Sequence, residues 1–333
     1  MGMLSGLLRP LLEKSRRGII FAGHGVATHW KDRSTEEVHI GIADFVDSID
    51  TLEALGFDFL GMEDVRAIAN NGFYHQKSWA HLTFDDGYRN NLDVIYPILK
   101  ARKIPFSIFV STHHVQTGDL FPTFWLRAAE YLNLPLAQLF DDVTPGAGIS
   151  TRIFQQKLRY ASFSDHRKIV EDVKRLFSPE DMSVLAEFEN DLPLSLEMLQ
   201  TLANDPLVHI GSHSHQHVVF HRGQDEGVAR SQMDQSWQLI SSVWALEAAP
   251  TFCFPNGDWS PQWAQMASDV GYDMAFTCNS GFVDKSTQAQ IMPRFWLSNR
   301  RRLLLICGMS ILGDKWLRLF GRKALPKLNV AVQ

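Results

Sequence analysis

Two short segments of the sequence combine residues that can hold a metal ion and move protons. The first, residues 81–88, reads HLTFDDGY and places Asp85 beside Asp86 at the end of an apolar run. The second, residues 209–217, reads HIGSHSHQH and contains four of the thirteen histidines. Adjacent carboxylates repel each other, so a site that keeps both charged usually supplies a cation. Imidazole is a common metal ligand at neutral pH.

The spacing within the second segment suits metal binding. His213 and His217 are four residues apart, which on a helical turn places both rings on one face. One carboxylate and two imidazoles provide three protein ligands and leave room for water, as in a catalytic zinc-type site. The spare carboxylate is then a candidate general base. Taken singly, each segment also has an ordinary explanation, because Asp-Asp-Gly is a common turn sequence and histidines gather on polar surface loops.

The elements expected around these segments alternate between short apolar strands and helices. Strands are predicted at residues 18–22, 57–60, 79–84, 105–110, 207–210, 251–254 and 272–277, and helices at 44–55, 90–102 and 261–270. This alternation predicts an α/β fold with a mostly parallel sheet, and the number of strands favours a (β/α) barrel. Both chemical segments follow a predicted strand, which is where such barrels build their sites.

The chain is expected to be a barrel with an addition at each end and one in a loop. Residues 1–17 are predicted to form an N-terminal amphipathic helix, 18–298 the barrel, and 299–333 a C-terminal amphipathic helix and tail. Residues 119–194 have few strand signals and are predicted to be a helical insertion. Helices that are both basic and apolar can lie on a bilayer, so the two ends either contact a membrane or pack on the barrel itself.

Composition and charge limit the classes of function. Of 333 residues, 45% are hydrophobic and 21% charged, which is typical of a globular protein and excludes a disordered chain or coiled coil. The net charge of −5 argues against a nucleic-acid partner. Three widely spaced cysteines fit neither a disulfide framework nor a cysteine zinc site. Because neither a signal peptide nor a spanning segment is found, we expect a cytoplasmic protein, peripheral at the inner face of the membrane if the terminal helices bind there.

The two segments resemble the first two motifs of the polysaccharide deacetylases, the NodB-homology domain of carbohydrate esterase family 4. TFDDG at residues 83–87 and HSHQH at 213–217 match the family motifs TFDDG and H-[S/T]-x-x-H in the same order. FCFPNG at 252–257 is similar to the third motif, and the resemblance covers roughly residues 18–297. It implies a distorted, NodB-like (β/α) barrel of about seven strands and one divalent metal ion, usually zinc. The branch suggested is a cytoplasmic one associated with surface-polysaccharide biosynthesis.

The resemblance also implies roles for individual residues. Asp86, His213 and His217 would hold the metal ion, and Asp85 would be the catalytic base. Ser214 would support the histidine-containing loop by hydrogen bonding.

Two features of the family are missing, and other residues are candidates to replace them. The third motif often begins with an arginine that orients the base, but this chain has Cys253 there, and Arg294 is the candidate substitute. The family's general acid is a late histidine, but no histidine follows His221. His24, after the first predicted strand, is either the replacement acid or a structural loop residue.

Three residues are assigned to substrate binding. They are Asn256, whose backbone N–H the resemblance places at the oxyanion, Arg294, and Trp259, an aromatic residue in a predicted loop. Trp125, in the insertion, is a second aromatic candidate, and the pair at 113–114 (HH) is a candidate to line the cleft.

The expected function is metal-dependent removal of an N-acyl group, in the simplest case acetyl, from a sugar in bacterial surface-polysaccharide biosynthesis. The acetylated amino sugar would be linked to a nucleotide or a lipid, and the insertion would set specificity. Two alternatives stay open. One is an amidohydrolase of the same fold acting on a small non-sugar amide, and the other is a catalytically inactive carbohydrate-binding protein. The oligomeric state is not predicted.

Overall fold

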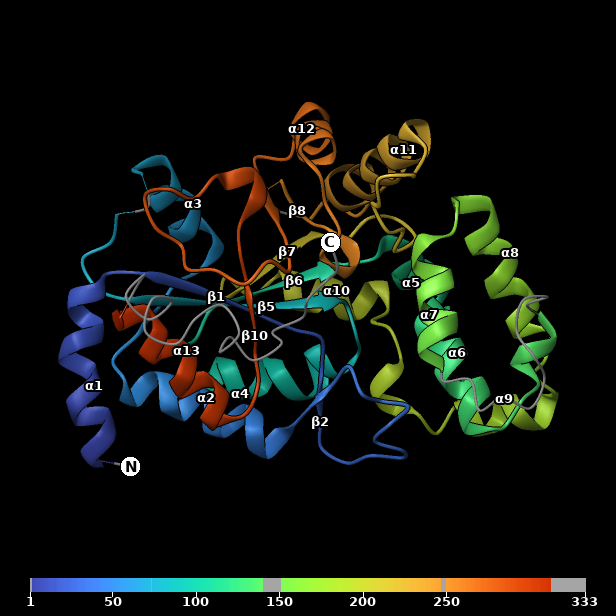
Figure 1. The fold of residues 1–333 in the computed structure, drawn as a ribbon, viewed down its shortest axis with the longest axis horizontal. Helices are drawn as coiled ribbons and strands as arrows, with labels where there is room; N and C mark the ends of the chain where they lie inside the picture. Colours follow the sequence, from blue (N-terminus) through green and yellow to red (C-terminus); the bar gives the residue numbers. More distant parts are fainter. Residues whose placement is uncertain (1, 73, 140–150, 247–249, 313–333) are drawn as a thin grey trace.

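The centre of the molecule is a curled sheet of parallel strands (Figure 1). The computed structural model describes residues 2–72, 74–139, 151–246 and 250–312. Seven strands follow the order β10-β1-β5-β6-β7-β8-β9, and β4 pairs with the first part of β5. Helices surround the sheet, so the predicted distorted (β/α) barrel is confirmed.

The strands of this sheet and of a small second sheet are short. Their bounds are β1 Gly18–Gly23, β2 Val26–Ala27, β3 Ile40–Gly41, β4 Asp58–Phe59, β5 Trp79–Asp86, β6 Phe106–Val110, β7 Val208–Ser212, β8 Thr251–Cys253, β9 Met274–Phe276 and β10 Phe295–Trp296. Every residue of β1, β5 and β6 is buried, as expected for parallel strands that are covered on both faces.

Helices precede, separate and follow the strands along the chain. Their bounds are α1 Gly2–Ser15, α2 Ile42–Ala54, α3 Met62–Asn70, α4 Tyr96–Ala101, α5 Thr112–Thr117, α6 Pro122–Tyr131, α7 Thr151–Tyr160, α8 Phe163–Lys174, α9 Pro179–Leu185, α10 Leu196–Ala203, α11 Glu226–Gln238, α12 Pro261–Val270 and α13 Arg300–Leu312. The start of α12 is as predicted, because the Ser260 hydroxyl accepts a hydrogen bond from the Trp263 N–H. Gly271, in the left-handed region at φ 112°, ends it.

The unpredicted strand β10 joins the two edges of the sheet. Phe295 and Trp296 pair with β1, and Met292, just before them, forms a parallel bridge with Phe276 of β9. The segment from 292 to 296 therefore contacts both ends of the strand order and closes the barrel. Arg294 lies in the middle of this closing segment. Two paired residues carry too little apolar periodicity for the strand to be predicted from sequence.

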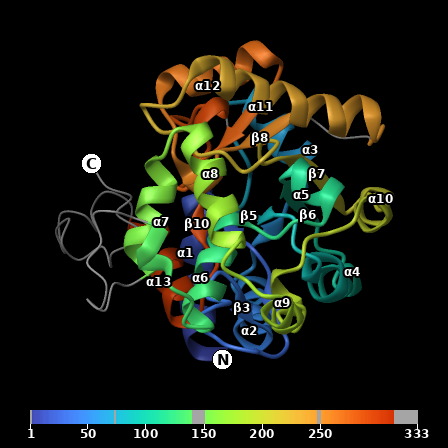
Figure 2. The ribbon, with the colours of Figure 1, turned by 90° about the vertical axis from the view of Figure 1, so that its right-hand side faces the viewer.

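The insertion predicted for residues 119–194 contains helices α6 to α9. They lie beyond the carboxyl ends of β5 and β6 in Figure 1, and Figure 2 shows α7 and α8 in front of the strand ends. These helices have an apolar core of their own, which includes Phe124, Trp125, Leu126, Phe154, Leu158 and Phe188. Because Trp125 belongs to this core and is 4% exposed, it cannot serve as a sugar platform.

The two terminal helices pack on the barrel. Leu12 of α1 and Leu303 and Ile306 of α13 are buried in the main core. The described part of each helix therefore uses its apolar face for packing, which is one of the two alternatives that the sequence left open. Residues 313–333 of the predicted C-terminal element lie outside the described residues. Within the described part of the chain, each helix is too short or too polar to cross a bilayer.

Candidate active site

The end of β5 and the loop after β7 bring the three predicted metal ligands together. Asp86 Oδ1 lies 3.3 Å from His213 Nε2 and 3.2 Å from His217 Nε2. This oxygen is buried and has no hydrogen-bond partner among the described residues. Burial raises the pKa of Asp86, but the neighbouring histidines outweigh it and hold the pKa well below 3.8. An ionised carboxylate that faces two imidazole nitrogens fits a divalent cation held by all three residues.

Backbone strain gathers at the same place. Asp86, Ser214, His217 and Asn256 all have positive φ angles, between 53° and 75°. Left-handed backbone is unfavourable for residues with a side chain, and it persists where the surrounding structure requires it, often at functional sites. Here the sharp turns direct polar side chains toward the carboxyl end of the sheet.

Asp85 is held by Arg294. Arg294 Nη1 donates a 2.7 Å hydrogen bond to Oδ1 of this carboxylate, and Nη2 donates one of 2.7 Å to Oδ2. Arg294 is 1% exposed and also donates to the Thr83 hydroxyl and the Thr277 carbonyl oxygen. Burial raises the pKa of Asp85, but the Arg294 charge and hydrogen bonds outweigh it and keep the pKa below 3.8. Asp85 is therefore ionised at neutral pH and oriented to accept a proton.

This geometry corrects one role predicted for Arg294. It lies behind Asp85 and is not among the residues that line the cavities, so its assignment to substrate binding was wrong. Its other predicted role, as the substitute for the arginine that orients the base, agrees with its contacts.

Cys253 occupies the position at which the third motif often has arginine. Its Sγ lies 3.0 Å from Arg294 Nη2 and 3.5 Å from Asp85 Oδ1. Asp85, His213 and Cys253 form a second group that could hold a metal ion. However, Arg294 already supplies the positive charge there, and burial raises the pKa of the Cys253 thiol well above 9, so the thiol stays protonated. The candidate metal site is therefore the group formed by Asp86, His213 and His217.

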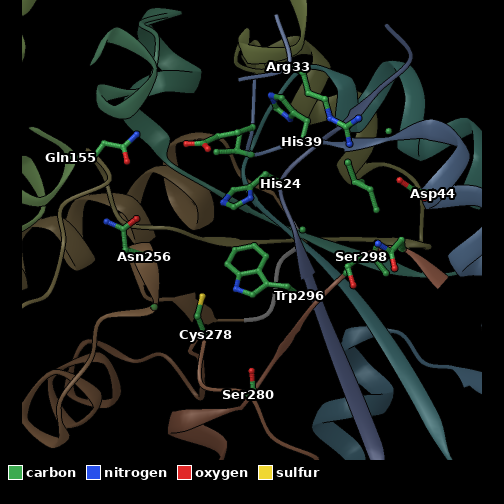
Figure 3. A pocket seen from close by; sticks show the side chains of 18 of the residues that line it. His24, Arg33, His39, Asp44, Gln155, Asn256, Cys278, Ser280, Trp296 and Ser298 are labelled. Carbon is green, nitrogen blue, oxygen red and sulfur yellow. The ribbon is translucent and has the colours of Figure 1, made fainter. Parts of the chain in front are cut away.

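His24 directly follows β1 and lies beside the candidate metal site. Its Nε2 is 3.9 Å from Asp86 Oδ2. The ring stacks on Trp296, with 5.0 Å between ring centroids and 19° between planes, and Figure 3 shows both rings at the centre of the pocket. Burial lowers the pKa of His24 from 6.5, although the Asp86 and Asp85 charges act against this shift. The position suits a group that meets a substrate bound above Asp86.

Two adjoining cavities extend from these residues. The inner one, of about 360 Å³, has Asp85, Asp86, His213 and His217 in its walls. The outer one, of about 1040 Å³, runs toward α2 and the start of α13. The two share a set of wall residues that includes His24, Gln155, Arg159, Asn256, Cys278 and Trp296 (Figure 3).

Two other predicted site residues lie differently from what the sequence led us to expect. Trp259 is partly buried against the apolar cluster of α11 and α12 and lines neither of the two cavities, so the structure does not bring it together with the other candidate site residues. The buried Ser214 hydroxyl has no hydrogen-bond partner among the described residues, so it does not support the loop as predicted. The backbone supports the loop instead, since the Thr112 N–H donates to the Ser214 carbonyl and the His113 N–H to the His215 carbonyl.

The remaining candidates fall into two groups. Asn256 lines both cavities, as a substrate contact must. His113 and His114 line a separate cavity of about 220 Å³ between α5 and α8. They do not line the cavity that contains Asp85 and Asp86.

A group of buried polar side chains lies next to Asp86, and no sequence motif predicted it. Tyr88 is 1% exposed and lies beside the carboxylates of Asp86 and Asp191, and burial raises the pKa of its hydroxyl well above 10. Arg127 Nη2 donates a 3.1 Å hydrogen bond to Asp191, and His39 is 3.5 Å from the same carboxylate. Arg127 and Asp191 belong to the insertion, so only folding brings them to this place.

A comparison with known protein families identifies the family to which the chain belongs. A model of the polysaccharide deacetylase family matches residues 74–275, which is more than half of the chain, and the chain therefore belongs to that family. The matched region contains Asp85, Asp86, His213 and His217 but neither His24 nor Arg294. No curated protein matches the chain in sequence at a significant level.

Several solved structures have a similar fold. Streptococcus pyogenes deacetylase PplD, in complex with acetate, is 16% identical with a TM-score of 0.55, over 87% of this chain and 96% of that one. IcaB from Ammonifex degensii is 15% identical with a TM-score of 0.58, over 89% and 97%. The BpsB deacetylase domain from Bordetella bronchiseptica is 14% identical with a TM-score of 0.52, over 85% and 96%. At these identities the likeness establishes the fold alone.

Proposed function

We propose that the protein hydrolyses the N-acyl group, in the simplest case acetyl, of an amino sugar, with one zinc ion held by Asp86, His213 and His217. The observation that carries this proposal is the Asp85–Arg294 pair, which keeps an ionised, oriented carboxylate beside a group of metal-binding side chains. Membership of the polysaccharide deacetylase family supports a carbohydrate substrate.

In this proposal, each residue of the site has a separate role in amide hydrolysis. A divalent ion in such a site supplies Lewis acidity, which polarises the acyl carbonyl and acidifies water. Asp85 accepts a proton from the attacking water. The backbone N–H of Asn256 donates to the oxyanion that develops on the acyl oxygen. His24 donates a proton to the departing amine, so that the products are a carboxylic acid and a free amino sugar.

Elemental analysis tests the proposed metal site. We expect about one zinc ion per chain in the purified protein and none in the Asp86→Ala/His213→Ala double variant. His29→Ala, which removes an exposed histidine, is the matched control and should keep the ion. If the wild-type protein takes up no metal on dialysis against zinc, the proposed hydrolase would be excluded and a carbohydrate-binding protein would become the better explanation.

An Asp85→Asn variant tests the base separately from the metal. We expect turnover of an acetylated amino sugar to fall about 10²- to 10⁴-fold while the metal content stays the same. Retained activity would remove Asp85 from the mechanism. Activity on small amides without any sugar would identify the protein as a different amidohydrolase.

The proposal also includes the form of the substrate and the place of the reaction. The sugar would be a nucleotide-linked or lipid-linked precursor of a bacterial surface polysaccharide, processed in the cytoplasm at the membrane face. Leu11 and Leu305, 47% and 37% exposed, are apolar side chains that the described parts of the terminal helices offer to a bilayer. Vesicles of anionic lipid should therefore bind the wild-type protein better than a Leu11→Glu/Leu305→Glu variant. Equal binding would exclude contact through these helices.

A further inference from the structure

The inner cavity lies between the barrel and the helical insertion. Asp86, His213 and His217 form the wall at the strand ends. The insertion contributes polar residues to the other walls, namely Thr123 and Arg127 from α6 and Gln155, Gln156 and Arg159 from α7. Figure 2 shows α7 across the carboxyl end of the sheet. The insertion thus covers the catalytic end of the barrel as a cap.

An ion pair ties this cap to the loop after β8. Arg159 Nε and Nη2 donate hydrogen bonds of 2.6 Å to the two carboxylate oxygens of Asp258, which lies two residues after Asn256. The two side chains are 24% and 20% exposed, so the pair is partly shielded from water. Bidentate pairs of this kind impose a defined geometry as well as attraction.

Two further contacts hold the cap in place. The Nε2 atom of His221, which lies in the chain after β7, is 3.1 Å from the carbonyl oxygen of Ala161, the residue after α7. Arg127 of α6 donates to the carbonyl oxygen of Thr35, a buried residue outside the insertion. The cap is therefore attached to the rest of the fold through α6, through the residue that follows α7 and through the Arg159–Asp258 pair of α7 itself.

The walls common to both cavities mark where a substrate passes between them. His24, Asn256 and Trp296 lie on this boundary. The three candidate metal ligands line the inner cavity alone, and so do Thr123 and Gln156. Among the described residues, the two cavities thus meet at a boundary that includes His24, whose Nε2 is 3.9 Å from Asp86 Oδ2.

From this arrangement we infer that the site deacylates an amino sugar at the end of a glycan or carrier and not a unit within a polymer. This inference rests on the proposed function. The inner cavity, of about 360 Å³, has the volume of a small-ligand site and suits one acylated sugar. An internal unit has chain on both sides, and one of these chains would have to pass the residues that α6 and α7 contribute to the walls of the inner cavity. The rest of the substrate extends into the outer cavity, whose polar walls include Arg33, Glu37, Asp44, Asn279, Ser280 and Asn299.

Product mapping on defined substrates tests the inference. The zinc-loaded protein is incubated with a methyl glycoside of N-acetylglucosamine and with its O4- and O6-linked pentasaccharides, and the deacetylated positions are located by tandem mass spectrometry. We expect hydrolysis of the single sugar and of one terminal unit, with internal units at least about tenfold slower. Internal deacetylation as fast as terminal deacetylation would overturn the inference and leave the proposed function intact. No hydrolysis of any acylated sugar by zinc-loaded protein would instead count against the proposed function.

An Asp258→Asn variant tests whether the cap causes this selectivity. Loss of the Arg159 pair should raise the rate at internal units relative to the terminal unit and speed proteolytic cleavage within α7. Asp172→Asn is the matched control, since Asp172 pairs with the exposed Lys168 of α8 and with the exposed Arg175 directly after this helix. This control should leave the distribution of products unchanged. Faster cleavage of α7 in Asp258→Asn with an unchanged distribution of products would show that the cap does not select terminal units.

Discussion

Arg294 donates a hydrogen bond of 2.7 Å to each carboxylate oxygen of Asp85, although the two residues are 209 positions apart in the chain. Both side chains are almost fully buried, at 0% and 3% exposure. A buried carboxylate without a partner would be driven toward its neutral form, which cannot accept a proton. The arginine therefore preserves the charge that the base needs and also directs it.

A lysine at position 294 would keep the charge but lose the planar fork. We expect Arg294→Lys to lower kcat about 10- to 100-fold at unchanged metal content, as is usual for the loss of a supporting hydrogen bond. Arg294 holds the pKa of Asp85 down, so a weaker partner lets this pKa rise. The acid limb of the pH–rate profile should then move to higher pH. A profile that does not move would show that Arg294 does not control the ionisation of Asp85.

An arginine at the neighbouring position 253 should partly replace Arg294 as the partner of Asp85. Removing one partner of a buried ion pair costs roughly 3–5 kcal/mol, so Arg294→Ala should lose about that much unfolding free energy and most of its activity. Cys253 Sγ lies 3.5 Å from Asp85 Oδ1, so an arginine at 253 can enter the space vacated at 294. We expect the Arg294→Ala/Cys253→Arg variant to recover part of both properties in urea unfolding and kinetic assays. If neither activity nor unfolding free energy recovers, an arginine near Asp85 is not sufficient and must come from position 294.

The proposed acid predicts a specific change in pH dependence. His24→Gln should lower kcat by about 10²- to 10⁴-fold and remove the alkaline limb of the pH–rate profile, since glutamine has no proton to lose. Trp296→Phe, which keeps an aromatic ring against His24, is the control and should retain that limb. An alkaline limb that persists in His24→Gln would assign the acid role to another group.

A buried histidine that is not one of the candidate metal ligands should make stability depend on pH. His81 is fully buried, and its two ring nitrogens are within 2.9 Å of the Leu60 carbonyl and the Ser107 hydroxyl. Burial lowers its pKa from 6.5 to about 4. Between these values the unfolded chain binds a proton that the folded chain does not, so stability falls as the pH drops from 6.5 toward 4. The slope from this residue is at most about 1.4 kcal/mol per pH unit.

Urea unfolding at several pH values measures this term. The difference in unfolding free energy between pH 7 and pH 5 should be smaller in His81→Gln than in the wild-type protein. His29→Gln, at an exposed histidine, should behave like the wild-type protein. An equal pH dependence in His81→Gln and the wild-type protein would show that His81 does not contribute.

Local patterns were sufficient for the framework of the fold. The strands at 18–22, 79–84 and 105–110 were predictable because buried parallel strands are short apolar runs, and the ends of α12 because Ser260 and Gly271 have local capping preferences. Asp85 and Asp86 lie in one motif, and His213 and His217 in another. Short spacing on one strand end or one loop constrains where such side chains point, so their candidate roles could be inferred from sequence.

What the sequence alone left undecided depends on contacts between distant parts of the chain. Arg294 could have bound substrate or supported Asp85, and the closing of the barrel through β10 decided between them. Trp259 and Trp125 have the residue type of a sugar platform, but packing places both in apolar clusters. The Arg159–Asp258 pair joins residues 99 positions apart. No periodicity encodes such a pair, because its geometry exists only once the insertion has folded over the barrel.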